Sequence, residues 1–452
     1  MKKRGVVLLL ASCLTLLLGG CAFRQVDELY TLPKLPGDYQ NLQAKIEEVT
    51  TGTGAEYSAP TGGQPVQFQD LDGDGTLEAI AFFKVANDEK PLKIYIFRLG
   101  SDGYELGAVI EDNSNSTAIG SIYYENLCGT PTKELVVSWQ KNTGVGTLAV
   151  YSVDKYEVNE LLSTAYTDYN LLDIDMDNQR EILVINVDTV EESRSKVDCY
   201  KADKASLVLT GSAPLSQGIG KLDTTALRVG NLKGDAPIPA LYVTSTLTLG
   251  DKDVTDIFAW RNDALENITL NAETGQSSAT IREKDKAKPT YINNDNVLAL
   301  PVPIEQPSGA QNAPKLDAWY QYNMNGSSSL VYTTYHDFAE GWYFILPSNW
   351  VGQVTVTQDA SMPGEKRTAF GYWTKGAGGA EGKSETFLTI YKLTGPNRHT
   401  RARLGNRFTI AADDTTIYCA EFITGGWNCG LDQNAVKNDH FKLSSIDWTT
   451  TG

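Results

Sequence analysis

The sequence predicts a mainly β fold: a β-propeller built from degenerate repeats of about 50–60 residues, followed by a small C-terminal β-rich or α+β domain. Three observations support this prediction. A nine-residue segment recurs along the chain, an aliphatic run of strand length follows most of its copies, and helix signals are scarce. A long alternation of helices and parallel strands is absent, which argues against a two-lobed solute-binding protein.

The N-terminus has the organisation of a signal peptide. The short basic region MKKRG precedes the apolar run VVLLLASCLTLLLGG, which is too short and ends too abruptly for a membrane-spanning helix. The run closes on Leu18-Gly19-Gly20-Cys21, which resembles a bacterial lipobox and implies cleavage before Cys21 and lipid (palmitate) on that residue. We therefore expect residues 1–20 to be a lipoprotein signal peptide. Acyl chains would anchor the mature protein to the extracytoplasmic face of the bacterial cell membrane. An ordinary secretion signal with an incidental cysteine is the alternative.

The net charge of −17 is unevenly distributed, because residues 330–452 contribute only −1 of it. The preceding part of the chain is therefore strongly acidic. Such a body argues against nucleic acid, and against an anionic membrane surface, as the binding partner. It is compatible with bound divalent cations.

One helix is expected before the repeats. The stretch GDYQNLQAKIEEV places Leu42, Ile46 and Val49 at helical spacing. We expect an amphipathic helix over residues 37–50, at the end of a lipidated N-terminal segment (residues 21–55), packed on the propeller.

The recurring segment is clearest in DLDGDGTLE, residues 70–78, and DIDMDNQRE, residues 173–181. Three worn copies, NLCGTPTKE, NLKGDAPIP and YINNDNVLA, begin at residues 126, 231 and 291. The second position is aliphatic in all five copies, and successive starts lie 56, 47, 58 and 60 residues apart. Runs such as IAFFK and ILVIN follow. We expect residues 56–305 to form the propeller.

The acidic frame of the first copy predicts a calcium site, because alternate carboxylates of a tight turn converge and calcium takes six to eight oxygen ligands. The predicted ligands are Asp70, Asp72, Asp74, Glu78 and the carbonyl of Thr76. Gly75 permits the positive φ that the reversal needs. An EF-hand is excluded, because its twelfth loop position would be Ala81 or Val184 in place of a bidentate Glu, and strands flank the loop.

This pattern, DxDxDGxxE before an aliphatic strand, resembles the FG-GAP/VCBS-type repeats of β-propellers, although the FG-GAP signature itself is not clear. In that family the loop joins two strands of a blade and binds calcium. The resemblance covers roughly residues 60–305. It implies a second calcium site whose ligands are Asp173, Asp175, Asp177, Gln179 and Glu181, with Asn178 in the place of Gly75.

The alternative for both loops is an empty acidic turn whose carboxylates accept hydrogen bonds from local backbone N–H groups. The three worn loops are expected to hold no metal. In the fourth copy Lys233 occupies a ligand position, and we expect its ammonium to stand in for the ion.

After residue 305 the composition changes, and six of the eight tryptophans follow. We expect a linker over residues 306–329 and an aromatic-rich domain over residues 330–452. The alternative is that Ser328 to Phe344 completes the propeller. The succession GWYFILPSNW and FLTIYKLTG resembles the ending of uncharacterised lipoproteins of Gram-positive bacteria.

The tryptophans either fill a small core or form an exposed platform for a sugar or a protein. The cationic stretch NRHTRAR (residues 397–403) is either a contact for anionic cell-wall polymer or a solvated surface. Cys419 and Cys429 either pair across a hairpin or stay free. Cys128 and Cys199 are expected to be buried thiols.

No catalytic constellation is found: HExxH, GxSxG and GxxxxGK[ST] are all absent. We therefore expect a non-enzymatic lipoprotein, a calcium-stabilised propeller scaffold that binds a protein or a cell-envelope glycan. The rival is an enzyme acting on cell-wall or other polysaccharides, with its acids in the propeller funnel. A sporulation or envelope-assembly scaffold is a third possibility that the sequence does not separate from the first.

Overall fold

The computed structural model describes residues 37–444, apart from residues 143, 192–193, 205, 285–286, 309–312, 377–381 and 424–426. The predicted signal peptide and the predicted lipidation site Cys21 lie outside the described residues, as does Trp448. The chain divides into two compact units, Met1–Ser121 with Val153–Val158, and Ile122–Ser152 with Asn159–Gly452. None of the helices in the described ranges is long and apolar enough to span a membrane.

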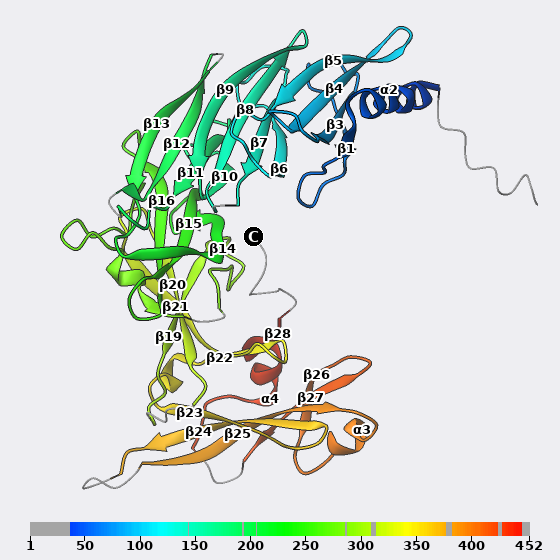
Figure 1. The fold of residues 1–452 in the computed structure, drawn as a ribbon. Helices are drawn as coiled ribbons and strands as arrows, with labels where there is room; N and C mark the ends of the chain where they lie inside the picture. The colour runs from blue at the N-terminus through cyan, green and yellow to red at the C-terminus, as the bar shows by residue number, and fades with distance from the viewer. Residues whose placement is uncertain are drawn as a thin grey trace, which may run out of the picture. The chain divides into compact units, whose positions relative to one another are not determined.

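The fold is mainly β, as predicted, and the described part of the chain forms six antiparallel sheets of four or five strands (Figure 1). The first sheet has the order β1-β3-β4-β5, with β2 also paired to β3. Its strands are β1 (Ala55–Tyr57), β2 (Val66–Gln69), β3 (Glu78–Val85), β4 (Leu92–Gly100) and β5 (Gly103–Glu111). The second sheet runs in chain order through β6 (Ala118–Glu125), β7 (Glu134–Gln140), β8 (Gly146–Asp154) and β9 (Glu157–Tyr166).

The next two sheets also follow chain order. The third contains β10 (Asp168–Leu172), β11 (Glu181–Asn186), β12 (Lys196–Asp203) and β13 (Ser206–Pro214). The fourth contains β14 (Ile219–Leu232), β15 (Ile238–Leu247), β16 (Lys252–Arg261) and β17 (Ala264–Asn267), with β18 (Arg282–Glu283) also paired to β16. Successive four-stranded antiparallel meanders of this kind are the units from which propeller blades are made.

The last two sheets depart from simple chain order. The fifth joins β19 (Ala299–Ile304), β20 (Leu316–Tyr322), β21 (Ser328–Asp337), β22 (Trp342–Leu346) and the late strand β28 (Phe441–Leu443). The sixth has the order β23 (Val354–Met362), β24 (Glu365–Thr374), β25 (Lys383–Thr394), β27 (Thr416–Phe422), β26 (Phe408–Ala412).

The predicted N-terminal helix is confirmed as α2 (Gly37–Thr53), which packs on the first sheet (dark blue in Figure 1). Leu42 and Ile46 are buried and Val49 packs beside them, as expected for apolar side chains one helical turn apart. They contact a cluster that includes Phe83 of β3 and Tyr104 of β5.

The five nine-residue segments lie at equivalent corners of successive sheets, as predicted. Four of them connect the strands β2 to β3, β6 to β7, β10 to β11, and β14 to β15. The fifth ends where β19 begins, and the strand before it is reduced to one antiparallel bridge between Thr290 and Ala299. The aliphatic second positions are all buried: Leu71, Leu127, Ile174, Leu232 and Ile292.

The predicted linker over residues 306–329 is wrong, because β20 lies inside this range and pairs with β19 and β21. Trp319 and Tyr322 of β20 are fully buried. The segment Ser328 to Phe344, which the alternative assigned to the propeller, lies in β21 and β22 and extends the same sheet. The prediction failed because the Pro- and Gly-rich run before β20 was extended over the apolar strand that follows it.

Three of the five described tryptophans after residue 305 fill core positions, and Trp373 and Trp427 are half-buried. Trp319, Trp342 and Trp350 are buried, and no tryptophan is among the large apolar side chains exposed in the described ranges. The cationic stretch forms the short helix α3 (Arg398–Arg401), in which the Arg398 and Arg401 guanidinium groups donate to backbone carbonyls of neighbouring turns. These contacts favour a structural role over a polymer-binding one.

The pairing of Cys419 with Cys429 is not formed, and both are free, buried thiols. They lie in different apolar clusters: Cys419 packs with Leu393 and Ala402, and Cys429 packs with Trp350. Cys199 is buried as predicted, and burial raises its pKa to about 12. Cys128 is only half-buried, which corrects the prediction for that residue.

Acid should destabilise the protein through His336 of β21. Its ring stacks on Phe338 and Tyr343, both at 5.1 Å between ring centroids, and burial lowers its pKa to about 3. In the unfolded chain this histidine binds a proton below its ordinary pKa of about 6.5. In the folded chain it stays neutral until the pH approaches about 3. This contribution to the free energy of unfolding is therefore complete above pH 6.5 and is lost as the pH falls toward 3.

Substituting His336→Phe should flatten that dependence. Between pH 7 and pH 5, we expect the variant to lose about 2 kcal/mol less free energy of unfolding than the wild type, at roughly 1.4 kcal/mol for each pH unit below 6.5. Urea unfolding at the two pH values measures this difference. Equal losses in both proteins would contradict the assignment.

Candidate metal centre

The first loop brings three of its five predicted ligands together. Carboxylate oxygens of Asp70, Asp72 and Glu78 all lie within 4.8 Å of one another. The Asp74 carboxylate is not part of this group. The Asp74 carboxylate instead accepts a hydrogen bond from the Thr76 backbone N–H at 2.6 Å.

Local hydrogen bonds and two glycines shape this loop. Asp70 accepts from the N–H groups of Gly73 and Gly75 at 2.8 and 3.1 Å, and Asp72 accepts from Asp74 N–H at 3.2 Å. Gly75 has the predicted positive φ, 86°, and Gly73 has a φ of 76°. The backbone hydrogen bonds expected of an acidic turn are therefore present. They leave lone pairs available, because each carboxylate oxygen can accept more than one bond.

Glu78 is the buried member of the group, with an exposed fraction of 2 %. Its Oε2 accepts a hydrogen bond of 2.8 Å from Leu71 N–H. Burial, assisted by the charges of the neighbouring aspartates, raises the pKa of Glu78 to about 7 against the lowering effect of this bond. No lysine or arginine of the described ranges forms an ion pair with any of the four carboxylates of the loop. The group therefore fits a divalent cation, which would supply the missing positive charge.

A cationic residue faces the first loop from the adjacent strand but is held elsewhere. Arg98 of β4 lies opposite Glu78, one residue beyond the Ala79–Phe97 pair. Its guanidinium pairs with Glu105 and lies 4.9 Å from the centre of the Tyr156 ring. The Tyr156 hydroxyl in turn donates to Asp72 at 3.4 Å.

The second loop repeats the same geometry. Carboxylate oxygens of Asp173, Asp175 and Glu181 lie within 4.8 Å of one another, and Ile174 N–H donates to Glu181 Oε2 at 3.0 Å. Asn178 has a φ of 70°, as predicted from its place in the repeat. Asp177 is outside the group, and its carboxylate accepts a hydrogen bond of 2.8 Å from Gln179 N–H.

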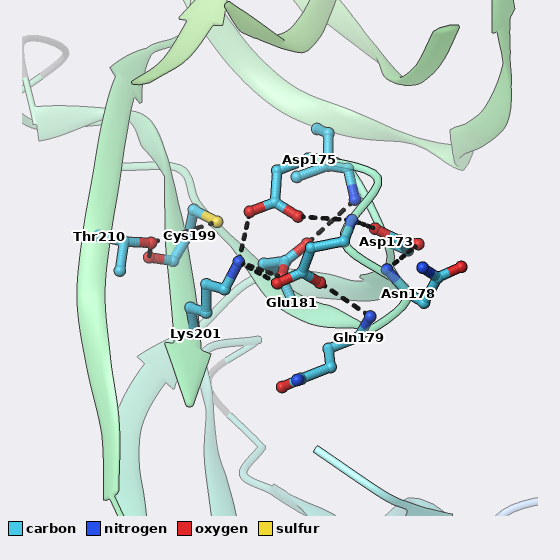
Figure 2. Close-up of polar contacts among 10 residues, drawn as sticks. Asp173, Asp175, Asn178, Gln179, Glu181, Cys199, Lys201 and Thr210 are labelled. Carbon is cyan, nitrogen blue, oxygen red and sulfur yellow. Dashed lines mark hydrogen bonds and ion pairs between the residues drawn. The ribbon is translucent and has the colours of Figure 1, made fainter. Parts of the chain in front are cut away.

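A lysine side chain from the neighbouring strand enters the second loop. Figure 2 shows Lys201 reaching from β12 into the loop, where its ammonium lies 2.5 Å from Asp175 Oδ2 and 2.6 Å from Asp177 Oδ2. Burial acts to lower the pKa of Lys201, but the hydrogen bonds to the two aspartates outweigh it and raise that pKa above its usual value. The same hydrogen bond lowers the pKa of Asp177.

The worn loops keep parts of this arrangement. In the third, Leu127 N–H donates to Glu134 Oε2 at 2.8 Å, as in the two acidic loops. In the fourth, the expectation for Lys233 is wrong, because its ammonium donates to the Ser329 hydroxyl at 2.9 Å and does not fill its own loop. In the fifth, the Gln321 side-chain amide donates to Asp295 at 2.8 Å.

Sequence reasoning missed Lys201, Arg98 and Gln321, which all face a loop from the next strand. A signal was available, since both acidic copies are followed by a cationic residue twenty positions after their final glutamate. That signal has meaning only when the strand register is known, because the register brings the two positions opposite each other.

No protein-family model matches this sequence, and no curated protein matches it significantly. Distant structural similarity is found to a rhamnogalacturonan lyase from Bacillus licheniformis, with 11% identity, a TM-score of 0.27 and 70% of each chain covered. An α-L-arabinofuranosidase from Fusarium graminearum, solved as a mutant with an iminosugar inhibitor, has 11% identity and a TM-score of 0.26. That alignment covers 73% of this chain and 94% of the other. Similarity of this degree does not carry a shared activity.

Proposed function

We propose that this protein is a lipid-anchored extracytoplasmic scaffold whose first loop binds Ca²⁺, and that it binds a protein or a cell-envelope glycan without catalysing a reaction. The observation that carries the proposal is the uncompensated group of Asp70, Asp72 and Glu78. These acids meet at the start of β3, and a bound cation there would brace the corner between β2 and β3.

The donor set favours calcium over other metals. All convergent ligand atoms are carboxylate oxygens, which suit hard cations, whereas Zn²⁺ and Cu²⁺ sites usually include histidine or cysteine. The loop offers oxygens from a flexible turn, and Ca²⁺ tolerates irregular geometry better than Mg²⁺ does. Extracytoplasmic calcium modules work with dissociation constants of roughly 10⁻⁴–10⁻³ M, so a partly exposed loop is adequate there.

Calorimetry with CaCl₂ tests the metal site directly. We expect one calcium site in the mature protein and none in the Asp72→Asn variant, because the amide keeps the shape of the side chain but loses its charge. The matched control is Asp102→Asn, which neutralises an exposed aspartate in the turn between β4 and β5. It should leave the site intact. The absence of any binding heat in the wild type would overturn the proposal.

The anchor and the absence of catalysis need separate tests. Labelled palmitate should enter the wild-type protein in bacterial cells and fail to enter Cys21→Ala. Degradation of any cell-wall or plant polysaccharide by the pure protein would favour the rival enzymatic function.

A further inference from the structure

The two acidic loops are not equivalent, although their sequences place the same acids in the same order. We infer that Lys201 is a tethered cation that occupies the second loop in place of a metal ion, so that this chain has one metal-binding loop and one lysine-closed loop. The inference deepens the proposed function and relies on it only for the first loop.

The position of Lys201 is set by strand register. The pair Ile182–Tyr200 joins β11 to β12, and one residue further along, Lys201 lies opposite Glu181. From there the ammonium reaches three acids at once, at 2.5 Å from Asp175, 2.6 Å from Asp177 and 3.8 Å from Glu181. An ion ligated by these acids would need the same space.

Glu181 supplies an independent observation. Its exposed fraction is 0 %, and its Oε1 is buried without a hydrogen-bond partner. Figure 2 shows this carboxylate directed at the Lys201 ammonium within the loop. Burying such an oxygen in its charged form is costly unless a positive charge lies nearby. In the described structure that charge is the ammonium.

The side chains at the equivalent position of two other repeats behave differently from each other. In the fifth repeat Gln321 of β20 lies opposite Ala299, and its amide donates to Asp295 inside the worn loop. In the first repeat Arg98 occupies this position, yet Glu105 and the Tyr156 ring hold its guanidinium away. Gly107 makes room for that ring, because a Cβ there would lie 2.6 Å from Tyr156 Cδ1. A side chain opposite the ninth position thus fills its loop when it is free to reach the acids, as Lys201 and Gln321 do, and leaves it open when other contacts hold it, as for Arg98.

Calcium calorimetry on Lys201→Met tests the inference. Methionine keeps the length of the side chain and removes its charge, so we expect a second calcium site beside that of the first loop. Lys201→Arg, which retains the charge, should keep the wild-type number. In the Asp72→Asn background, Lys201→Met should raise the number of sites from none to one, and adding Asp175→Asn should abolish the gained site.

The outcomes separate this inference from the proposed function. No site in the wild type and one in Lys201→Met would support the lysine-closed loop while refuting calcium in the first loop. Two sites in the wild type, or no gain in Lys201→Met, would overturn the inference.

A second measurement uses the wild-type protein alone, so it does not require any variant to fold. Acetylation of Lys201 in the native wild-type protein, followed by mass spectrometry, should be slow and unchanged by millimolar calcium. A several-fold increase with calcium would show that the ion expels the lysine, and the inference would fail.

Discussion

Removing calcium lowers the melting temperature of the wild-type protein by about 10 °C, and the Asp72→Asn variant loses this response. A ligand present at about 100 times its dissociation constant stabilises the folded state by roughly 2.7 kcal/mol, and each kcal/mol shifts the melting temperature of a unit of roughly 100–150 residues by about 4 °C. The physical origin is the repulsion among Asp70, Asp72 and Glu78, which the ion relieves.

The measurement is a thermal melt followed by circular dichroism, with calcium and with a chelator. Because the chain forms two compact units, the affected transition is expected to be the one that reports the first unit. Asp102→Asn should respond to calcium as the wild type does. Identical melts with calcium and with chelator in the wild type would rule out a stabilising ion.

Substituting Trp350→Ala reduces the free energy of unfolding by about 3–5 kcal/mol, the range measured for large-to-small changes at buried aromatic positions. Trp350 ends the short helix η4 (Ser348–Trp350) and is fully buried. Its ring meets Phe387 of β25 at 4.8 Å and Phe344 of β22 at 5.7 Å, and its Nε1 donates to the Cys429 carbonyl at 2.9 Å. It therefore joins the fifth and sixth sheets.

Denaturant unfolding followed by circular dichroism measures this loss. Trp350→Phe should cost less, because most of the apolar contact remains and only the hydrogen bond to Cys429 is lost. Leu330→Ala, at a side chain that is 52% exposed, should change the free energy of unfolding by less than about 0.5 kcal/mol. A loss below about 1 kcal/mol in Trp350→Ala would mean that the fifth and sixth sheets do not depend on this contact.

The sequence predicted those parts of the fold that have a local period. The helix over Leu42, Ile46 and Val49 and the corners marked by buried aliphatic second positions were both recovered, because each depends on spacing within about a dozen residues. The convergence of Asp70, Asp72 and Glu78 was recovered for the same reason.

Features that depend on distant segments were not predicted. The strand β20 follows a Pro- and Gly-rich run and was therefore assigned to a linker. Cys419 and Cys429 are close in sequence, but they pack into separate apolar clusters. Lys201 enters its loop through cross-strand register, which a single sequence does not contain. The position of the Lys233 ammonium likewise depends on a hydrogen bond to Ser329, which lies far along the chain.

The hydrogen bond from the backbone N–H of the second residue to the ninth-position glutamate has a consequence for repeats whose acidic residues have been replaced. In three corners one oxygen of this glutamate receives the backbone N–H of Leu71, Leu127 or Ile174. The corner at Glu134 keeps this hydrogen bond, although it has no aspartates at the positions that hold them in the two acidic loops. The residues that reverse the chain are therefore distinct from those that bind the ion. A repeat that has lost its metal-binding aspartates can keep the same turn. Restoring acids around Glu134 is accordingly the natural place to graft a new site.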